Sequence, residues 1–206
     1  MTTDHIVRDL AALEALYGEV NEVSTLKEID YLHPHYAAFV KASPFAVLAT
    51  AGPDGLDASP RGDPPGFIEI IDDKTLLVAD RRGNNRIDSL RNIIADPHVA
   101  LLFLVPGVGE TLRVNGRAEI SVDPDLLARF AIVSKRPRSV LVIHIDKVFF
   151  QCSRALIRSE LWNPQKQLPR SALPSTGEIL AAVTHDRIDG RTYDRELPDR
   201  LKTTLY

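Results

Sequence analysis

The stretch from residue 45 to residue 152 is divided into short segments of strand length, and this division limits the folds open to the chain. Only two helical segments, 86–97 and 123–135, interrupt the strand segments. Strands and helices therefore do not alternate, as a doubly wound parallel sheet would require. The pattern instead predicts a small closed antiparallel barrel of six or seven strands. The expected strands are 45–50, 56–62, 67–71, 75–80, 98–105, 111–121 and 139–152.

Turn signals and residue alternation support the antiparallel arrangement. An Asp-Gly pair at 54–55 separates the first two strands, and an Asp-Asp pair at 72–73 separates the next two, so each pair is expected to form a hairpin. Within 111–121, apolar and polar residues alternate strictly, which places them on opposite faces of the strand. The segment 139–152 is long enough that we expect it to bend around the barrel.

Helical patterns precede the strand segments. We expect a helix over 4–18, capped by Asp4 and ended by Gly18, because apolar residues recur there at helical spacing. A capping-box pattern that starts at Thr25 predicts the beginning of a second helix. Pro34 is expected to break or restart this helical stretch.

The last part of the chain has a different character from the barrel segments. It contains several prolines and little periodicity outside 177–188, so we expect a partly ordered extension. The sequence is therefore divided into an N-terminal helical extension (1–40), a barrel domain (41–162) and a C-terminal extension (163–206).

Composition and charge exclude several classes of protein. The net charge of the 206-residue chain is −3, which argues against a nucleic-acid partner. Cys152 is the only cysteine, so we expect neither an intrachain disulfide nor a cysteine-based metal site, and no other metal site is predicted. No secretory signal is visible, and the longest apolar run, 99–105, is far shorter than the roughly 20 residues that cross a bilayer. We therefore expect a cytoplasmic protein with no membrane partner.

The motifs of the common catalytic sites do not occur in the sequence. There is no P-loop, dinucleotide-binding motif, nucleophile elbow or zinc-protease motif. His33 and His35 are interpreted as ordinary residues at a helix end. His144 is interpreted as a hydrogen-bonded strand residue or, alternatively, as a site residue. Cys152 lacks a catalytic signature nearby, and a packing role is expected for it.

Arginines gather where two of the expected strands end. The segment 80–86 contains three of them and runs from a strand into the start of a helix. Its glycine and two asparagines favour turns in which backbone N–H groups converge, and Asn84 or Asn85 can cap the helix that begins near Arg86. Arginine side chains and helix N-termini both attract phosphate. The segment therefore indicates an anion site, although a solvated basic turn has the same pattern.

The order of these segments resembles the pyridoxamine 5′-phosphate oxidase-like flavoproteins, the FMN-binding split barrels. The resemblance covers about residues 45 to 162, and it includes a Ser-Pro-Arg-Gly-Asp segment at 59–63 and a Gly-Asn-Asn-Arg segment at 83–86. It implies a mainly β fold with flanking helices, a split β-barrel of six to seven antiparallel strands. It also implies a domain-sharing homodimer that binds FMN at the subunit interface.

The resemblance also implies which residues bind FMN. In the family, an arginine of the second barrel strand and a Ser-Arg-Lys step at a helix start hold the phosphate, and a polar segment at a strand end faces the flavin ring. Asparagine replaces the arginine of that step here, and Arg81 or Arg82 would compensate for the lost charge. The residues of this chain in these segments are Ser59, Arg61, Asp80, Arg81, Asn85 and Arg86.

Four further FMN contacts follow from the later segments of the resemblance. Thr111 stands where the family has a glutamine against the flavin, and Arg113 follows it on the same strand face. Phe150 stands at the position of a stacking tryptophan, and Arg158 at that of an arginine that reaches the FMN of the other subunit. Arg113 or Arg158 would supply positive charge near N1 of the flavin, which stabilises the reduced form.

Two departures from the family pattern bear on the substrate. Ile157 replaces a histidine of the last segment, and Asp63 stands where the first FMN strand of the family carries a lysine. Oxidation of pyridoxine 5′-phosphate itself is therefore not expected. The sequence predicts an FMN-dependent oxidoreductase that acts on an unidentified small molecule. The alternatives are a non-catalytic flavin-binding protein and a barrel that holds a deazaflavin or haem, with His144 as the candidate haem ligand.

Overall fold

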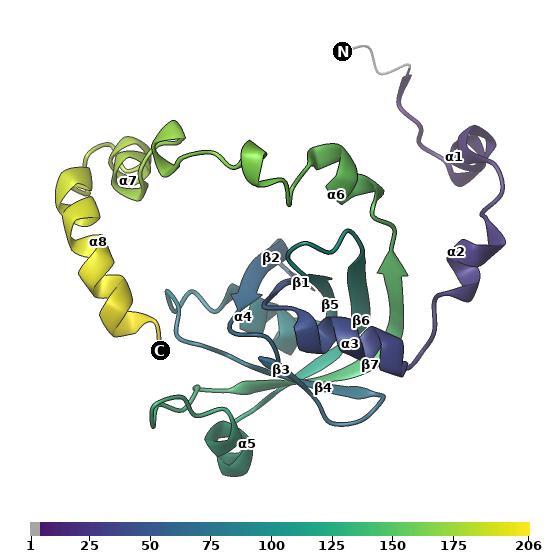
Figure 1. Cartoon of the computed structure of the whole chain (residues 1–206), viewed down its shortest axis with the longest axis horizontal. Coiled ribbons are helices and arrows are strands. Elements are labelled where there is room, and N and C mark those ends of the chain that lie inside the picture. The colour runs from purple at the N-terminus through teal and green to yellow at the C-terminus, as the bar shows by residue number, and fades with distance from the viewer. Residues whose placement is uncertain (1–4) are drawn as a thin grey trace.

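The computed structural model describes residues 5–206, and its centre is a single seven-stranded antiparallel sheet (Figure 1). The strand order is β2-β1-β5-β6-β7-β4-β3. The sheet curls into a split barrel whose two edge strands are β2 and β3. The prediction of a closed barrel is therefore wrong, because these two edges do not pair with each other. The strands are β1 Phe45–Gly52, β2 Gly55–Gly62, β3 Ile68–Ile70, β4 Thr75–Ala79, β5 His98–Leu104, β6 Thr111–Ser121 and β7 Val140–Gln151.

The two predicted hairpins are present, and their turns lie where the sequence indicates. β1 pairs with β2 along its whole length. In the turn between them, Gly55 has a φ of +114°, which residues with a side chain rarely adopt. β3 pairs with β4 across the turn at 71–74, where Asp72 accepts a hydrogen bond of 2.8 Å from the backbone of Lys74. This contact stabilises the turn conformation locally.

The longest strand pairing joins β6 to β7 and includes an irregularity that bends the sheet. The register shifts between Asn115 and Gly116, where β7 contributes one extra residue, Asp146. Gly116 is required at this point, because a Cβ there would lie 2.2 Å from the main-chain oxygen of His144. A bulge of this kind increases the local twist, which agrees with the predicted bend in the last strand.

Two helices contribute to the same core as the sheet. Val40 of α3 is fully buried and Ile93 of α4 is 4% exposed, and both pack into the cluster that contains the inward residues of the strands. In Figure 1, α3 and α4 lie against the curled sheet. The helices are α1 Leu10–Tyr17, α2 Glu22–Leu26, α3 Pro34–Ala42, α4 Asp88–Ala95, α5 Pro124–Arg129, α6 Arg154–Ser159, α7 Thr176–Val183 and α8 Gly190–Thr204.

The helices before the sheet start at other residues than expected. Asp4, the predicted cap of the first helix, lies outside the described residues, and Asp9 caps α1 by accepting a hydrogen bond from Ala12. The capping box at Thr25 is wrong, because α2 begins after Asn21 and ends at Leu26. Short-range capping patterns occur by chance, and several polar residues compete for the role.

Three further predictions concern where helices begin and end. Gly18 ends α1, and Pro34 occupies the first turn of α3, so both predictions are confirmed. The helix expected over 123–135 is shorter, since α5 ends at Arg129. Val133 and Ser134 then take positive φ values, which a helix cannot include.

The extension after the sheet contains more helix than its sequence pattern predicts. α7 begins at a capping box formed by Ser175 and Glu178, and it packs against α8. Gly177 and Gly190 meet at the helix crossing, where a Cβ on Gly177 would lie 2.0 Å from the main-chain oxygen of Gly190. Asp194 accepts hydrogen bonds from the Ser175 hydroxyl and the Gly177 backbone, at 2.5 and 2.7 Å.

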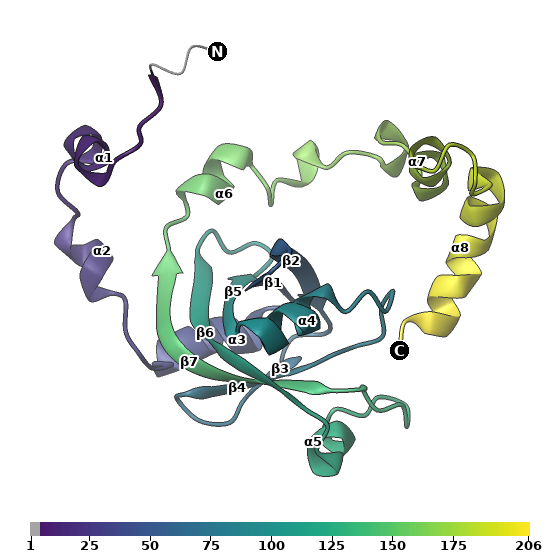
Figure 2. The ribbon, with the colours of Figure 1, turned by 180° about the vertical axis from the view of Figure 1, so that it is seen from behind.

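The segments at the two ends form arms outside the sheet (Figure 2). α1 and α2 extend on one side, and the α7–α8 hairpin lies on the other, with the end of α8 returning to the loop between β4 and α4. Many apolar residues of the arms are exposed, including Leu16, Val23 and Val183 at 69%, 68% and 67%. Within residues 5–206, no helix has the length and apolar character needed to cross a membrane.

Burial predicts that two leucines of the same hairpin differ greatly in how much their substitution lowers the free energy of unfolding. Leu48 of β1 is fully buried and Leu56 of β2 is 90% exposed. We expect Leu48→Ala to lower the free energy of unfolding by about 2–5 kcal/mol, because it removes buried methyl groups and leaves a cavity. Leu56→Ala should change it by less than about 0.5 kcal/mol. Urea denaturation of both variants checks this, and equal losses would contradict the assigned core.

Candidate functional site

The described residues form a pocket of about 810 Å³ beside the first turn of α4. Side chains from β2, from the loop between β4 and α4, and from the segment before β7 line it. Seven basic and only three acidic residues contribute, although the whole chain has a net charge of −3. The charged lining residues are Arg61, Arg81, Arg82, Arg86, Lys135, Arg136 and Arg138 with Asp57, Asp80 and Asp88.

The pocket brings together six of the ten residues that sequence comparison suggested for FMN binding. β2 and the residues after β4 lie far apart in the strand order, and the curl of the sheet brings them to the same pocket. The six residues are Ser59, Arg61, Asp80, Arg81, Asn85 and Arg86.

A network of hydroxyl groups joins β2 to α4 at the floor of the pocket. The Ser89 hydroxyl, on a residue that is 5% exposed, donates to Oδ2 of Asp57 at 2.6 Å. The Ser59 hydroxyl lies 2.9 Å from the Ser89 hydroxyl. Farther along α4, the Asn92 side chain donates to the Thr50 hydroxyl at 3.0 Å. These bonds hold the start of the helix against the strand that carries Arg61.

Arg61 has donors that the protein leaves unused. Its Nε is buried and has no hydrogen-bond partner. Nη1 donates to the Pro60 carbonyl at 3.2 Å, and Nη2 to the Ser89 hydroxyl at 3.4 Å, which are both long contacts. A guanidinium has five N–H donors, and leaving a buried donor without a partner is costly. The arrangement is typical of a side chain that is completed by an anionic ligand.

The loop before α4 has an unusual backbone. Asn85 and Ile87 take left-handed conformations with φ of +59° and +55°. For a β-branched residue such as Ile87 this is strained, and strain of this kind is often found in functional loops. The sequence suggested positive φ for the glycine and both asparagines of the loop, and of these three residues only Asn85 adopts it.

The predicted cap of α4 is wrong. The helix begins at Asp88 rather than near Arg86, and Ile87 stands at the N-cap position with no side-chain hydrogen bond. Asn84 instead accepts a 3.1 Å bond from the Arg86 backbone, which forms a local turn before the helix. The N-cap residue therefore provides no side-chain cap for the first helical turn, and residues 88–90 of this turn line the basic pocket.

Arg81 is held by the protein in a way that Arg61 is not. Its Nε donates to Asp63 at 2.9 Å, and Nη1 donates to the Phe130 carbonyl at 2.6 Å. The Asp63 side chain is only 4% exposed and also accepts a 2.7 Å bond from the Tyr206 hydroxyl. Asp63, at the position of a family lysine, thus serves as an anchor for Arg81.

Asp80 is the acidic residue most affected by the pocket. Partial burial raises the pKa of its carboxyl above the ordinary value of 3.8, by more than the nearby charges of Arg61 and Arg138 lower it. The folded protein therefore holds this proton more tightly than the unfolded chain. Stability attributable to Asp80 is greatest below the ordinary pKa and falls as the pH rises through the raised, folded-state pKa.

We expect Asp80→Asn to raise the unfolding temperature at pH 7, because the variant no longer buries a carboxylate. The gain should shrink as the pH is lowered toward 3.8, where the wild-type carboxyl is protonated. Asp54→Asn, in the exposed turn between β1 and β2, is the matched control. Thermal unfolding across this pH range checks the prediction, and a gain that does not depend on pH would refute it.

The other four predicted residues lie outside this pocket. The Thr111 hydroxyl donates to the Gln151 side chain at 3.1 Å, and the Arg113 guanidinium lies 4.0 Å from the centre of the Phe149 ring. Phe150 packs against the main core and Tyr36, and Lys27 lies 4.7 Å above its ring. Arg158 is exposed on α6 and pairs with neither Asp146, which binds Arg117, nor Glu160, which binds Lys166.

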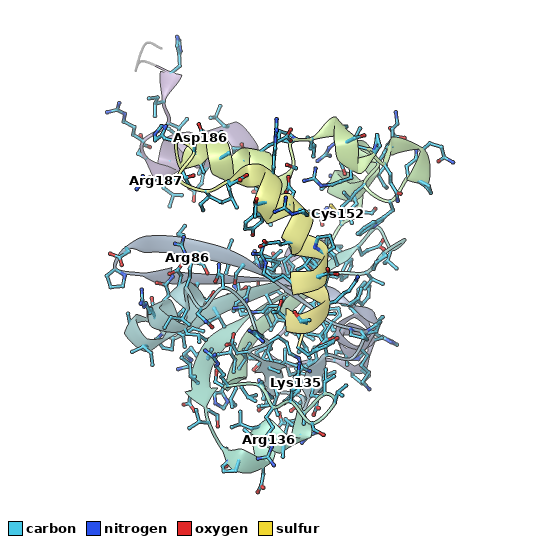
Figure 3. All side chains as sticks on the ribbon, turned by 90° about the vertical axis from the view of Figure 1, so that its left-hand side faces the viewer. Arg86, Lys135, Arg136, Cys152, Asp186 and Arg187 are labelled. Carbon is cyan, nitrogen blue, oxygen red and sulfur yellow. The ribbon has the colours of Figure 1, made fainter. Side chains whose placement is uncertain are left out.

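A short basic segment before β7 also belongs to the site. Lys135, Arg136 and Arg138 are three basic residues within four positions, and all of them line the pocket. Arg138 donates to the Asn85 side chain at 3.1 Å and so connects this segment to the loop before α4. Figure 3 shows Lys135 next to the end of α8. No sequence pattern indicates that Ser89 and Tyr206 belong to the pocket, because their positions depend on contacts with residues distant in the sequence.

The histidines and the cysteine are not part of the pocket lining. His33 accepts a bond from the His35 backbone at the start of α3, as expected for helix-end residues. His144 is exposed on β7, opposite Thr75 and Arg117. Cys152 is exposed, so its predicted packing role is wrong. Among residues 5–206, no group of three or more potential metal ligands comes together.

Comparison with solved structures finds similar proteins at low sequence identity. HupZ from Group A Streptococcus is 21% identical with a TM-score of 0.46, and the match covers 56% of this chain and 90% of that one. General Stress Protein 26 from Bacillus anthracis is 21% identical with a TM-score of 0.42, covering 55% and 88%. A Clostridium acetobutylicum protein related to general stress protein 26 is 12% identical with a TM-score of 0.45, covering 57% and 86%.

Sequence comparison points to one family. No curated protein matches the chain significantly. The family model described as pyridoxamine 5′-phosphate oxidase matches residues 32–152, which is more than half of the chain and includes all seven strands. The chain therefore belongs to the pyridoxamine 5′-phosphate oxidase family.

Proposed function

We propose that the chain is an FMN-dependent oxidoreductase that holds the FMN phosphate in the basic pocket beside α4. The observation that carries the proposal is Arg61, whose donors are unused in a pocket lined mostly by positive charge. A phosphate near neutral pH carries up to two negative charges, and guanidinium groups bind it through charge-assisted hydrogen bonds. The family supports FMN as the source of that phosphate.

The residues of the pocket fit a phosphate better than any uncharged group. Arg61 offers free donors on one side, and the uncapped first turn of α4 offers backbone N–H groups on the other. Ser59 and Ser89 add hydroxyl groups within hydrogen-bonding distance of each other. The volume of about 810 Å³ lies within the usual range for small-molecule sites. Arg86, whose only ion-pair partner among the described residues is Asp88, adds an exposed positive charge.

The flavin ring requires contacts beyond this pocket. Thr111, Arg113, Phe150 and Arg158 are the expected ring contacts, and all four lie outside the phosphate pocket of their own chain. We propose that they act across a homodimer, so that each site takes its phosphate residues from one subunit and its ring contacts from the other. The exposed apolar residues of the arms supply surface that such a dimer would bury.

When bound, FMN supplies the hydride or electron transfer, and the protein needs no catalytic acid or base for it. In this proposal Arg61 and the first turn of α4 bind the phosphate, and Arg81 stays fixed by Asp63. Asp80 lies between positive charges and limits how strongly the pocket attracts anions. The Arg113 guanidinium lies 4.0 Å from the centre of the Phe149 ring and would present positive charge to the flavin ring.

The substrate differs from that of the enzyme after which the family is named. Asp63 is engaged with Arg81 and Tyr206, so it does not replace the positive charge of the family lysine. Ile157 is 66% exposed on α6 and has no group that could bind a second phosphate. We therefore propose an uncharged or weakly charged small molecule rather than pyridoxine 5′-phosphate as the substrate.

The phosphate assignment predicts the effects of two arginine substitutions. We expect Arg61→Ala to weaken FMN binding by about 1.5–3 kcal/mol, roughly 10- to 150-fold in Kd, because it removes charged hydrogen bonds. Arg86→Ala should weaken it less, since this side chain is exposed and can move. Arg117→Ala, an exposed arginine on β6 outside the pocket, is the matched control. Flavin fluorescence titration measures each Kd, and an unchanged Kd in Arg61→Ala excludes the assignment.

A second measurement separates an enzyme from a flavin-binding protein. The protein with bound FMN is mixed with NADH or NADPH without oxygen, and the flavin absorbance near 450 nm (about the usual flavin maximum) is followed. Bleaching of the flavin is the expected outcome for an oxidoreductase. Flavin that stays oxidised with both reductants favours the non-catalytic alternative. The control is free FMN with the same reductants.

A further inference from the structure

We propose that Tyr206 occupies one side of the basic pocket and that a phosphorylated ligand displaces it to reach Lys135. The inference rests on the proposed function for the ligand, although its evidence is separate. Tyr206 follows α8 and lines the same pocket as Arg61 and Arg86. It comes 143 residues after Asp63 in the sequence, and its hydroxyl donates to the Asp63 carboxylate at 2.7 Å.

Three contacts hold the tyrosine in place. Besides the bond to Asp63, its ring lies 5.9 Å from the Arg81 guanidinium, and its main-chain oxygen accepts a 2.8 Å bond from Nζ of Lys135. Asp63 is almost completely buried, so its bond to the phenol is shielded from water. The bond also raises the pKa of the Tyr206 hydroxyl, which therefore stays a donor.

The arm behind Tyr206 can move without disturbing the sheet. α8 packs mainly on α7, through the Gly177–Gly190 crossing and the bonds of Asp194. Figures 1 and 2 show α7 and the start of α8 away from the barrel, and only the end of α8 returns to it. The contacts of Tyr206 thus join the hairpin to the pocket, and breaking them costs no core packing.

Closure and ligand binding compete for the same groups. Lys135 is one of the seven basic residues of the pocket, and its Nζ donates to Tyr206 while the tyrosine is in place. A phosphate that binds next to Lys135 gains its Nζ as a donor only after the tyrosine leaves. The apparent affinity is then reduced by the fraction of molecules that are closed. Tyr206 is in this sense an autoinhibitory residue and not a ligand contact.

The test compares Tyr206→Phe with the wild type in the full chain. The variant keeps the ring and removes the hydroxyl that binds Asp63. We expect its Kd for FMN, and separately for inorganic phosphate, to be about three- to tenfold lower than that of the wild type, because more molecules are open. Tyr193→Phe, on α8 outside the pocket, is the matched control and should leave both constants unchanged. Tyr206→Ala should act in the same direction as Tyr206→Phe.

Hydrogen exchange of α8 gives a readout that does not depend on affinity. Saturating phosphate or FMN should speed exchange in residues 190–206 of the wild type, whereas Tyr206→Phe should exchange fast without ligand. If phosphate binds and opens the arm but FMN does not bind, the proposed flavin function fails and the closure stands. Weaker or equal ligand binding by Tyr206→Phe, or exchange that ligands leave unchanged, overturns the closure. If no variant binds either probe, both proposals fall.

Discussion

The pairing of β6 with β7 is the contact on which the rest of the molecule depends. It joins the group β2-β1-β5 to the group β4-β3, and no other strand pairing connects the two within the described sheet. The bulge at Asn115 and Gly116 bends this pairing, and the curved sheet encloses one core together with α3 and α4. The same curvature brings the outer strand β2 near the residues that follow β4, so the pocket exists only because the sheet is curled.

The arginines of the pocket differ in the hydrogen-bond partners that they already have. Arg81 is bound to Asp63 and the Phe130 carbonyl, Arg138 to Asn85, and Arg86 to Asp88. Arg61 retains a buried Nε without a partner, and a buried donor gains more from an anion than an exposed one. The hydroxyls of Ser59 and Ser89 fix the distance between β2 and α4 around it. These bonds tie two walls of the pocket together without a ligand.

The strands could be predicted well and the helix boundaries less well, for a physical reason. Alternation along 111–121 and the turn at 54–55 reflect burial and backbone geometry that act within a few residues, and both predictions agree with β6 and the β1–β2 hairpin. The start of α4 depends instead on the strained backbone of Ile87, which no local pattern indicates. The helix α8 has a mostly polar sequence, and it is held by the crossing with α7.

The sequence by itself determined the antiparallel strands, because strand periodicity is a local property. Its resemblance to a known family indicated the six residues that meet in one basic pocket. The tertiary structure decided how those arginines are used. Whether an arginine is free or bound depends on carboxylates and carbonyls distant in the chain, such as Phe130 for Arg81. The position of Tyr206 was decided in the same way. Its hydrogen-bond partner Asp63 comes 143 residues earlier in the sequence, and only folding brings the two together.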